Sequence, residues 1–166
     1  MVDNTGIIAF AFGSPAKIFS NEIIARIAAA EAKRLKGPIY TQRDIRIEFE
    51  DGIAVDYTYE ESNKPPSTWF ICNGAVEWAK QNNFNKLIIV AAKPHLWRCM
   101  RDIKKAVQSL GVEITVKACG EIHEYPYQDW FCRESVQLRT RSKIIWTARE
   151  WIIKLMPFSF YKMLSN

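Results

Sequence analysis

The chain has 166 residues, of which 48% are hydrophobic and 25% are charged, and its formal net charge is +5 at pH 7. This composition is typical of a folded globular domain, and it excludes a disordered or collagen-like chain. No apolar run reaches the roughly 18 residues that a membrane-spanning helix needs. The N-terminal residues carry an acid and no basic segment before their apolar run, which argues against a signal peptide. We therefore expect one cytoplasmic domain over residues 1–166.

The positive charge lies in the second part of the chain. Residues 1–66 hold 8 basic and 10 acidic side chains, whereas residues 67–166 hold 15 basic and 8 acidic ones. Such an asymmetry has two interpretations, an anionic partner or a solvated basic face. We expect a small-molecule partner and no nucleic acid.

The cysteine pattern argues against a metal centre. The four cysteines form no Cys-x-x-Cys motif, and the chain has only two histidines, so a zinc site is not expected. Cys72 and Cys99 lie in helical patterns, where a free thiol usually behaves as a small buried hydrophobic group.

The first segments alternate between strand and helix. The apolar run GIIAFAFG (6–13) predicts a buried strand. A helical pattern begins at Ser20 and ends at Gly37-Pro38, where glycine and proline stop a helix. The short apolar segment PIYTQ (38–42) predicts a second strand.

Residues 45–60 predict a β-hairpin. Apolar and polar residues alternate on both sides of Asp51-Gly52, and this dipeptide between two alternating runs is typical of a tight turn. The polar positions of the first run are mostly acidic, which suits solvent better than a phosphate site.

The middle of the chain continues the alternation. After Pro65-Pro66, Ser67 can cap a helix over 67–83, and the run KLIIVAA (86–92) is the clearest buried strand. An amphipathic helix then runs to Gly111, and a further strand follows over 112–118. Strand and helix repeated with short connections predict a Rossmann-like α/β fold, with an open, mostly parallel sheet and helices on both faces.

The C-terminal part is basic and aromatic. We expect a helix over about 135–156, ended by Met156-Pro157, and then a short terminal extension. Two interpretations remain open for this helix. It packs its apolar stripe on its own domain, or it binds the inner face of an anionic membrane as a peripheral contact.

The candidate ligand site follows from the strand ends. In open parallel sheets, ligands bind beyond the carboxyl ends of the strands, and this rule selects three places: Gly13-Ser14, Thr41-Gln42-Arg43-Asp44 and Lys93-Pro94-His95. Helix starts expose free N–H groups that attract anions, and this adds Ser67 and Thr68. Glycine at position 13 would let a ligand approach the backbone.

His95 and Arg98 follow the strand over 86–92 directly and lie three residues apart, so they share one face of a helix start. Arginine can bind a carboxylate or phosphate with two parallel hydrogen bonds. The alternative is a histidine satisfied by the backbone beside a surface arginine. If the protein is an enzyme, His95 is the preferred general acid or base. The dinucleotide, Walker, nucleophile-elbow and zinc-protease motifs are absent, which leaves transferase and hydrolase chemistry open.

Four segments, taken in order, resemble the YdcF-like family, which includes SanA- and ElyC-type proteins. The first is the strand ending at Gly13 with the helix that carries Arg26 and Ala30. The others are STWFICNGA, IIVAAKPHLWR and REWIIKL, so that the resemblance spans about residues 6–155.

The resemblance implies a Rossmann-like domain that binds S-adenosylmethionine or takes part in bacterial envelope polysaccharide metabolism. It also adds Arg26 and Asn73 to the candidate site. The full set of ligand-binding residues predicted from the sequence is Gly13, Ser14, Arg26, Gln42, Asp44, Ser67, Thr68, Asn73, Lys93 and Arg98, with His95 as the catalytic candidate. The competing function is a non-catalytic adaptor that binds a membrane or a protein partner through the C-terminal helix.

Overall fold

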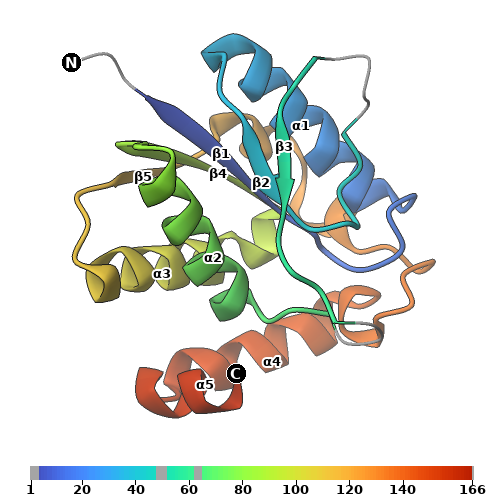
Figure 1. Cartoon of the computed structure of the whole chain (residues 1–166). Coiled ribbons are helices and arrows are strands. Elements are labelled where there is room, and N and C mark those ends of the chain that lie inside the picture. Colours follow the sequence, from blue (N-terminus) through green and yellow to red (C-terminus); the bar gives the residue numbers. More distant parts are fainter. Residues whose placement is uncertain (1–3, 48–51, 62–64, 166) are drawn as a thin grey trace.

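The computed structural model describes residues 4–47, 52–61 and 65–165 and contains a five-stranded parallel sheet (Figure 1). Its strands are β1 (Thr5–Phe10), β2 (Ile39–Thr41), β3 (Val55–Tyr57), β4 (Lys86–Ala91) and β5 (Thr115–Ala118). They are ordered β3-β2-β1-β4-β5, and every neighbouring pair is parallel. The chain adds β2 and β3 on one side of β1 and then β4 and β5 on its other side. The crevice between β1 and β4 is therefore the topological switch point, where ligands bind in such sheets.

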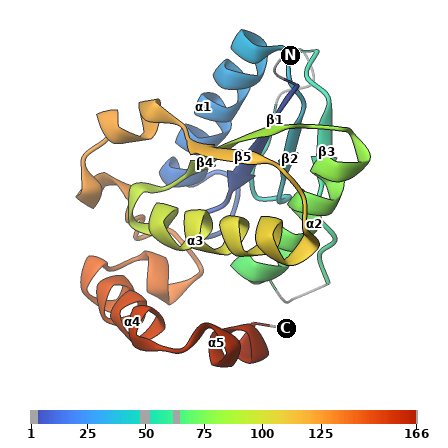
Figure 2. The same cartoon turned by 90° about the vertical axis from the view of Figure 1, so that its left-hand side faces the viewer.

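Helices cover both faces of the sheet, as predicted (Figure 2). Side chains of a strand alternate between its two faces. Ile7 of β1 and Ile88 of β4 therefore join the core under α1 (Phe19–Leu35). Their neighbours Ile8 and Leu87 join the core under α2 (Thr68–Gln81) and α3 (Lys93–Leu110). The Rossmann-like α/β class predicted from the sequence is thus confirmed.

The helix boundaries follow the signals in the sequence. The hydroxyl oxygen of Ser67 accepts a hydrogen bond from the backbone N–H of Phe70 at 3.1 Å and caps α2. Gly111 ends α3 in a left-handed conformation with φ of +60°. All four cysteines are buried free thiols, as expected for two of them from their helical positions.

The predicted hairpin at 45–60 is wrong in its described part. Residues 45–47 form no strand, and Val55–Tyr57 pairs in parallel with β2 instead of folding back on the preceding segment. Residues 48–51, which include Asp51, lie outside the described part of the chain. Alternation predicts that one face of a strand is buried, but it does not say which strand lies beside it.

The C-terminal helix begins later than predicted. Residues 135–142 form turns and a short 3₁₀ segment, and the helix α4 spans Lys143–Leu155. The following residues form a further short helix, α5 (Phe158–Leu164). Both helices lie together at the end of the molecule toward which the strands run (Figures 1 and 2). Among the described residues, no helix combines the length and apolar character that crossing a membrane requires.

The turns at 135–142 pack under the loop that follows β1. A Cβ atom at Gly13 would lie 2.6 Å from Oγ of Ser135 and 2.8 Å from Oγ1 of Thr140, and Gly13 has a φ of +101°. The two hydroxyl oxygens are themselves 2.8 Å apart in a hydrogen bond. Glycine at this position therefore admits the C-terminal segment of the protein itself, in addition to lining the cavity described below.

Replacing Gly13 by alanine is expected to lower the free energy of unfolding by about 2–3 kcal/mol, because it adds a steric clash to an unfavourable φ. Gly111→Ala is the matched control, since Gly111 also has a positive φ but no atom lies within 4 Å of the added Cβ. It should cost about 1 kcal/mol, the conformational penalty alone. Urea denaturation of both variants measures the difference, and equal losses would mean that the C-terminal segment is not packed against Gly13.

Candidate functional site

A cavity of about 330 Å³ opens at the carboxyl edge of the sheet, within the size range of small-molecule sites. The residues after β1 and β2, the starts of α2 and α3, and the C-terminal segment form its wall. Six residues predicted from the sequence line it, namely Gly13, Gln42, Ser67, Thr68, His95 and Arg98. The topology therefore brings together segments that are far apart in the chain.

Two strand ends are fixed to each other at the base of the cavity. The side-chain oxygen of Gln42 accepts a hydrogen bond from the backbone N–H of Ala11 at 2.9 Å. Gln42 follows β2 and is buried, and this bond joins it to the loop that follows β1. Its position in the wall is thus set by the sheet rather than by a mobile loop.

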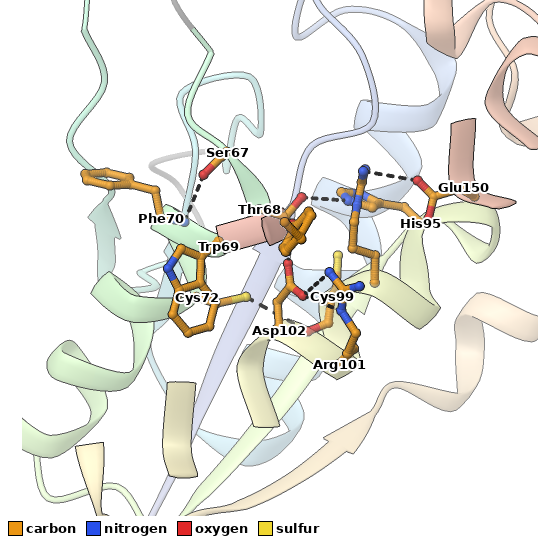
Figure 3. A network of polar contacts seen from close by, with 12 residues as sticks. Ser67, Thr68, Trp69, Phe70, Cys72, His95, Cys99, Arg101, Asp102 and Glu150 are labelled. Carbon is orange, nitrogen blue, oxygen red and sulfur yellow. Dashed lines mark hydrogen bonds and ion pairs between the residues drawn. The ribbon is translucent and has the colours of Figure 1, made fainter. Parts of the chain in front are cut away.

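His95 and Thr68 join the starts of the two helices. Nε2 of His95 lies 3.1 Å from the hydroxyl oxygen of Thr68 in a hydrogen bond (Figure 3). The imidazole is buried, and its ring packs edge-on against Trp146 with centroids 5.4 Å apart. Phe10 and Phe12 complete an aromatic environment around it, each with its centroid at 6.2 Å.

The environment keeps the His95 imidazole neutral at pH 7. Burial lowers the pKa of His95 well below its usual range, and Arg98, Arg149 and Arg139 act in the same direction. Nδ1 of the ring is buried and has no hydrogen-bond partner among the described residues. A buried polar atom of this kind is usually satisfied by water or by a ligand.

Arg98 is buried rather than exposed, which removes the alternative of a surface arginine. It is 4% exposed, and its Nη1 lies 3.1 Å from Oε1 of Glu150 on α4. Its guanidinium also lies over the ring of Trp146, 5.1 Å from the centroid, in a cation–π contact. Nε of Arg98 has no hydrogen-bond partner in the described structure.

Two further arginines, which the sequence prediction missed, come from the C-terminal segment. Arg139 lies in the turns before α4 and Arg149 lies on α4, and both line the cavity. Burial and the nearby Arg98 lower the pKa of Arg139. The same two causes, together with Arg139, lower the pKa of Arg149 to about 10. The three cations thus repel one another across the cavity.

Few negative charges balance the three arginines of the cavity. Of the charged residues in the described wall of the cavity, all three are arginines. Glu150 contacts Arg98 at 3.1 Å and Arg149 at 3.7 Å, and burial raises the pKa of its carboxyl group. One buried carboxylate therefore faces the arginines, and an excess of positive charge remains.

The wall formed by α5 is held by a second polar cluster. The hydroxyl group of Tyr161 donates a hydrogen bond to Oδ2 of Asp102 at 2.6 Å. Arg101 binds the other oxygen of this buried carboxylate at 2.7 Å (Figure 3). Its guanidinium lies over the Tyr161 ring. The hydroxyl of Ser67 donates to the backbone carbonyl of Ser165 at 2.5 Å. These contacts fix α5 to the start of α2 and to the middle of α3.

The other predicted residues do not line the cavity. Ser14 and Asp44 bind each other, with the hydroxyl group donating to Oδ1 at 3.4 Å. The amide of Asn73 donates to the carbonyl of Trp69 within α2 at 2.8 Å. Arg26 lies on α1, where its guanidinium faces the Tyr125 ring. Lys93 is the first residue of α3, two residues before His95, and is only partly buried.

A metal centre has no support in the described chain. Across residues 4–47, 52–61 and 65–165, no group of three or more His, Cys, Asp or Glu side chains is arranged to hold an ion.

Comparison of the sequence with protein-family models and with curated proteins finds no match. Among solved structures, the chain is similar to the universal stress protein from Archaeoglobus fulgidus in complex with dAMP. The two share 14% identity with a TM-score of 0.38, over 71% of this chain and 98% of that one. A likeness at this level carries no information on what this chain binds.

Proposed function

We propose that the protein binds a small molecule with a compact anionic group, such as a phosphate, in the cavity at the carboxyl edge of the sheet. The observation that carries this proposal is the cluster of Arg98, Arg139 and Arg149 in the wall of one cavity. Burial, together with repulsion from the neighbouring arginines, lowers the pKa values of Arg139 and Arg149. A bound anion would relieve this repulsion, so the cluster favours an anionic ligand.

The neutral donors and acceptors of the site support the same ligand class. Ser67, Thr68 and His95 lie at the starts of α2 and α3, where free backbone N–H groups and the helix dipole favour negative charge. The unpartnered Nδ1 of His95 can donate one further hydrogen bond when that nitrogen carries the proton. These groups position an anion, whereas the arginines supply most of the attraction.

The positive charge of the cavity favours some of the ligands that the sequence resemblance implies over others. S-adenosylmethionine carries a sulfonium, an ammonium and one carboxylate, so its net charge is positive, and three arginines that face the single carboxylate of Glu150 would repel it. A nucleotide or a nucleotide sugar carries one or more phosphates and fits the charge. Nucleotide sugars are also the donors that polysaccharide synthesis would require, so they are the ligands that join the charge of the cavity to the family resemblance.

Isothermal titration calorimetry with AMP, UDP-glucose, inorganic phosphate and S-adenosylmethionine tests the proposal. We expect the phosphate-bearing compounds to bind and Arg139→Gln and Arg149→Gln each to weaken their binding about tenfold, the effect of losing one charge-assisted hydrogen bond. Arg133→Gln is the matched control, because Arg133 is exposed in the same segment and does not line the cavity.

Two results would contradict the proposal. Equal affinities for the wild type and both cavity variants would place the anion elsewhere on the protein. Tighter binding of S-adenosylmethionine than of AMP would replace an anionic ligand by a cationic one. The Arg133→Gln protein should keep the wild-type affinity, which separates a loss at the cavity from a general loss of positive charge.

A further inference from the structure

The helix α4 has two apolar faces. Trp146 and Ile153 lie on the inner face and are 2% and 6% exposed. Ile144, Trp151 and Leu155 recur at helical spacing on the opposite face, where they are 80%, 60% and 79% exposed. An amphipathic helix that only packs on its own domain would carry polar residues on this second face. The exposed apolar face of α4 therefore requires another explanation.

Other residues extend the exposed apolar surface. On α4, Ile145 and Ile152 are 52% and 62% exposed beside the stripe, and on α5, Phe160 and Met163 are 48% and 63% exposed. The surface of α4 also has a shallow hollow, lined by Ile144, Ala148 and Trp151 with Lys143 and Thr147. Monomeric soluble proteins rarely expose apolar patches of this kind without a binding function. We call the set Ile144, Ile145, Ala148, Trp151, Ile152, Leu155, Phe160 and Met163 the outer apolar face.

The exposed charges that α4 and α5 place around the outer apolar face are mostly positive. Lys143 and Lys154 lie on α4 beside the stripe and Lys162 lies on α5, and all three are exposed. The chain from residue 135 to its end contains a single acidic residue, Glu150, which is buried against Arg98. Exposed apolar side chains bordered by lysines, with no exposed acid on either helix, are typical of helices that lie in the interface of an anionic bilayer.

We propose that the outer apolar face of α4 and α5 binds the surface of an anionic lipid membrane. Trp151, Ile152 and Leu155 would enter the boundary between headgroups and acyl chains, while Lys143, Lys154 and Lys162 lie at the level of the phosphates. Trp146 and Arg149 remain with the cavity. The contact is peripheral, and it is independent of whether the cavity holds a phosphate-bearing ligand.

A second copy of the chain is a weaker occupant of this face. A two-fold interface places the same patch of each copy against the other, so it would bring Lys143, Lys154 and Lys162 of both copies close together. The segment from residue 135 onward has no exposed acid that could pair with these lysines. A two-fold dimer would therefore place like charges next to each other, which is unfavourable. An anionic lipid surface supplies the missing negative charge.

Vesicle co-sedimentation of the full chain tests this proposal. We expect binding to vesicles of phosphatidylglycerol and phosphatidylcholine in about equal parts, and much weaker binding to pure phosphatidylcholine or in about 0.5 M NaCl. The double variant Trp151→Ser/Leu155→Ser should bind the anionic vesicles at least about tenfold more weakly, because two large apolar side chains no longer enter the bilayer. Both residues are exposed, so the variant should fold normally.

Val136→Ser provides the control, since Val136 is 66% exposed but lies before α4 and outside the outer apolar face. It should bind vesicles like the wild type. Equal binding by the double variant, or no sedimentation of the wild type with anionic vesicles, would overturn the proposal. Light scattering that shows a dimer in solution, converted to a monomer by the double variant, would assign the face to a second copy instead. Titration of the double variant with AMP reports on the cavity separately.

Discussion

Replacing Glu150 by glutamine is expected to lower the free energy of unfolding by about 3 kcal/mol and at the same time to tighten the binding of AMP severalfold. Removing one member of a buried ion pair leaves the other charge uncompensated, which is strongly destabilising. Arg98 is 4% exposed and its Nη1 contacts Glu150 at 3.1 Å. Nε of Arg98 also has no hydrogen-bond partner among residues 4–47, 52–61 and 65–165, so within this part of the chain the variant leaves the guanidinium almost unpaired.

The affinity changes in the opposite direction because Glu150 competes with the ligand for the same cations. Without its carboxylate, Arg98 and Arg149 are free to pair with a phosphate, and we expect about a three- to tenfold gain in affinity. Urea denaturation measures the stability and calorimetry measures the binding of AMP. Phosphate in the denaturation buffer should restore part of the lost stability, since a ligand that binds only the folded state stabilises it.

Glu113→Gln is the control for this experiment, because Glu113 is exposed, precedes β5 and does not line the cavity. It should change neither quantity measurably. A loss of stability in Glu150→Gln with weaker AMP binding would mean that Glu150 orders the site rather than competing with the ligand. In that case the arginines would need their carboxylate in order to be correctly placed.

The regular elements of the fold were predictable from local patterns. The runs over 6–13 and 86–92 are apolar throughout because their strands are buried on both faces between α1 and the pair α2 and α3. Ser67 and Gly111 mark helix ends through their own backbone geometry. The strand partner of Val55–Tyr57 was not predictable in this way, since pairing with β2 depends on the path of the whole chain.

The site was only half predictable, for a related reason. Gly13, Gln42, Thr68 and His95 follow from the rule that parallel strands present their carboxyl ends at one edge. Arg139 and Arg149 obey no spacing rule, because the turns and helix that carry them are placed by tertiary packing. The excess of basic residues in the second part of the chain was the one signal of their role. It was compatible with an anionic partner or with a solvated basic face, and it did not identify the residues.

Trp146→Ala is expected to lower the free energy of unfolding by about 3–5 kcal/mol, as large-to-small substitutions of buried aromatic residues do. Trp146 is 2% exposed, and its Nε1 donates a hydrogen bond to the carbonyl of Pro94 at 3.1 Å. Its ring also packs against Phe12, with centroids 4.6 Å apart. The substitution thus removes contacts of α4 with the loop after β1 and with the start of α3.

Trp151→Ala is the matched control, because it removes the same side chain from the same helix at a position that is 60% exposed. It should change the free energy of unfolding by less than about 0.5 kcal/mol, as expected for a surface substitution. Urea denaturation of both variants gives the comparison. Similar losses would mean that α4 does not distinguish an inner from an outer face. A large loss for Trp146→Ala alone would show that α4 is part of the folded core, so that Trp151 and its exposed neighbours are held outward by a fixed helix.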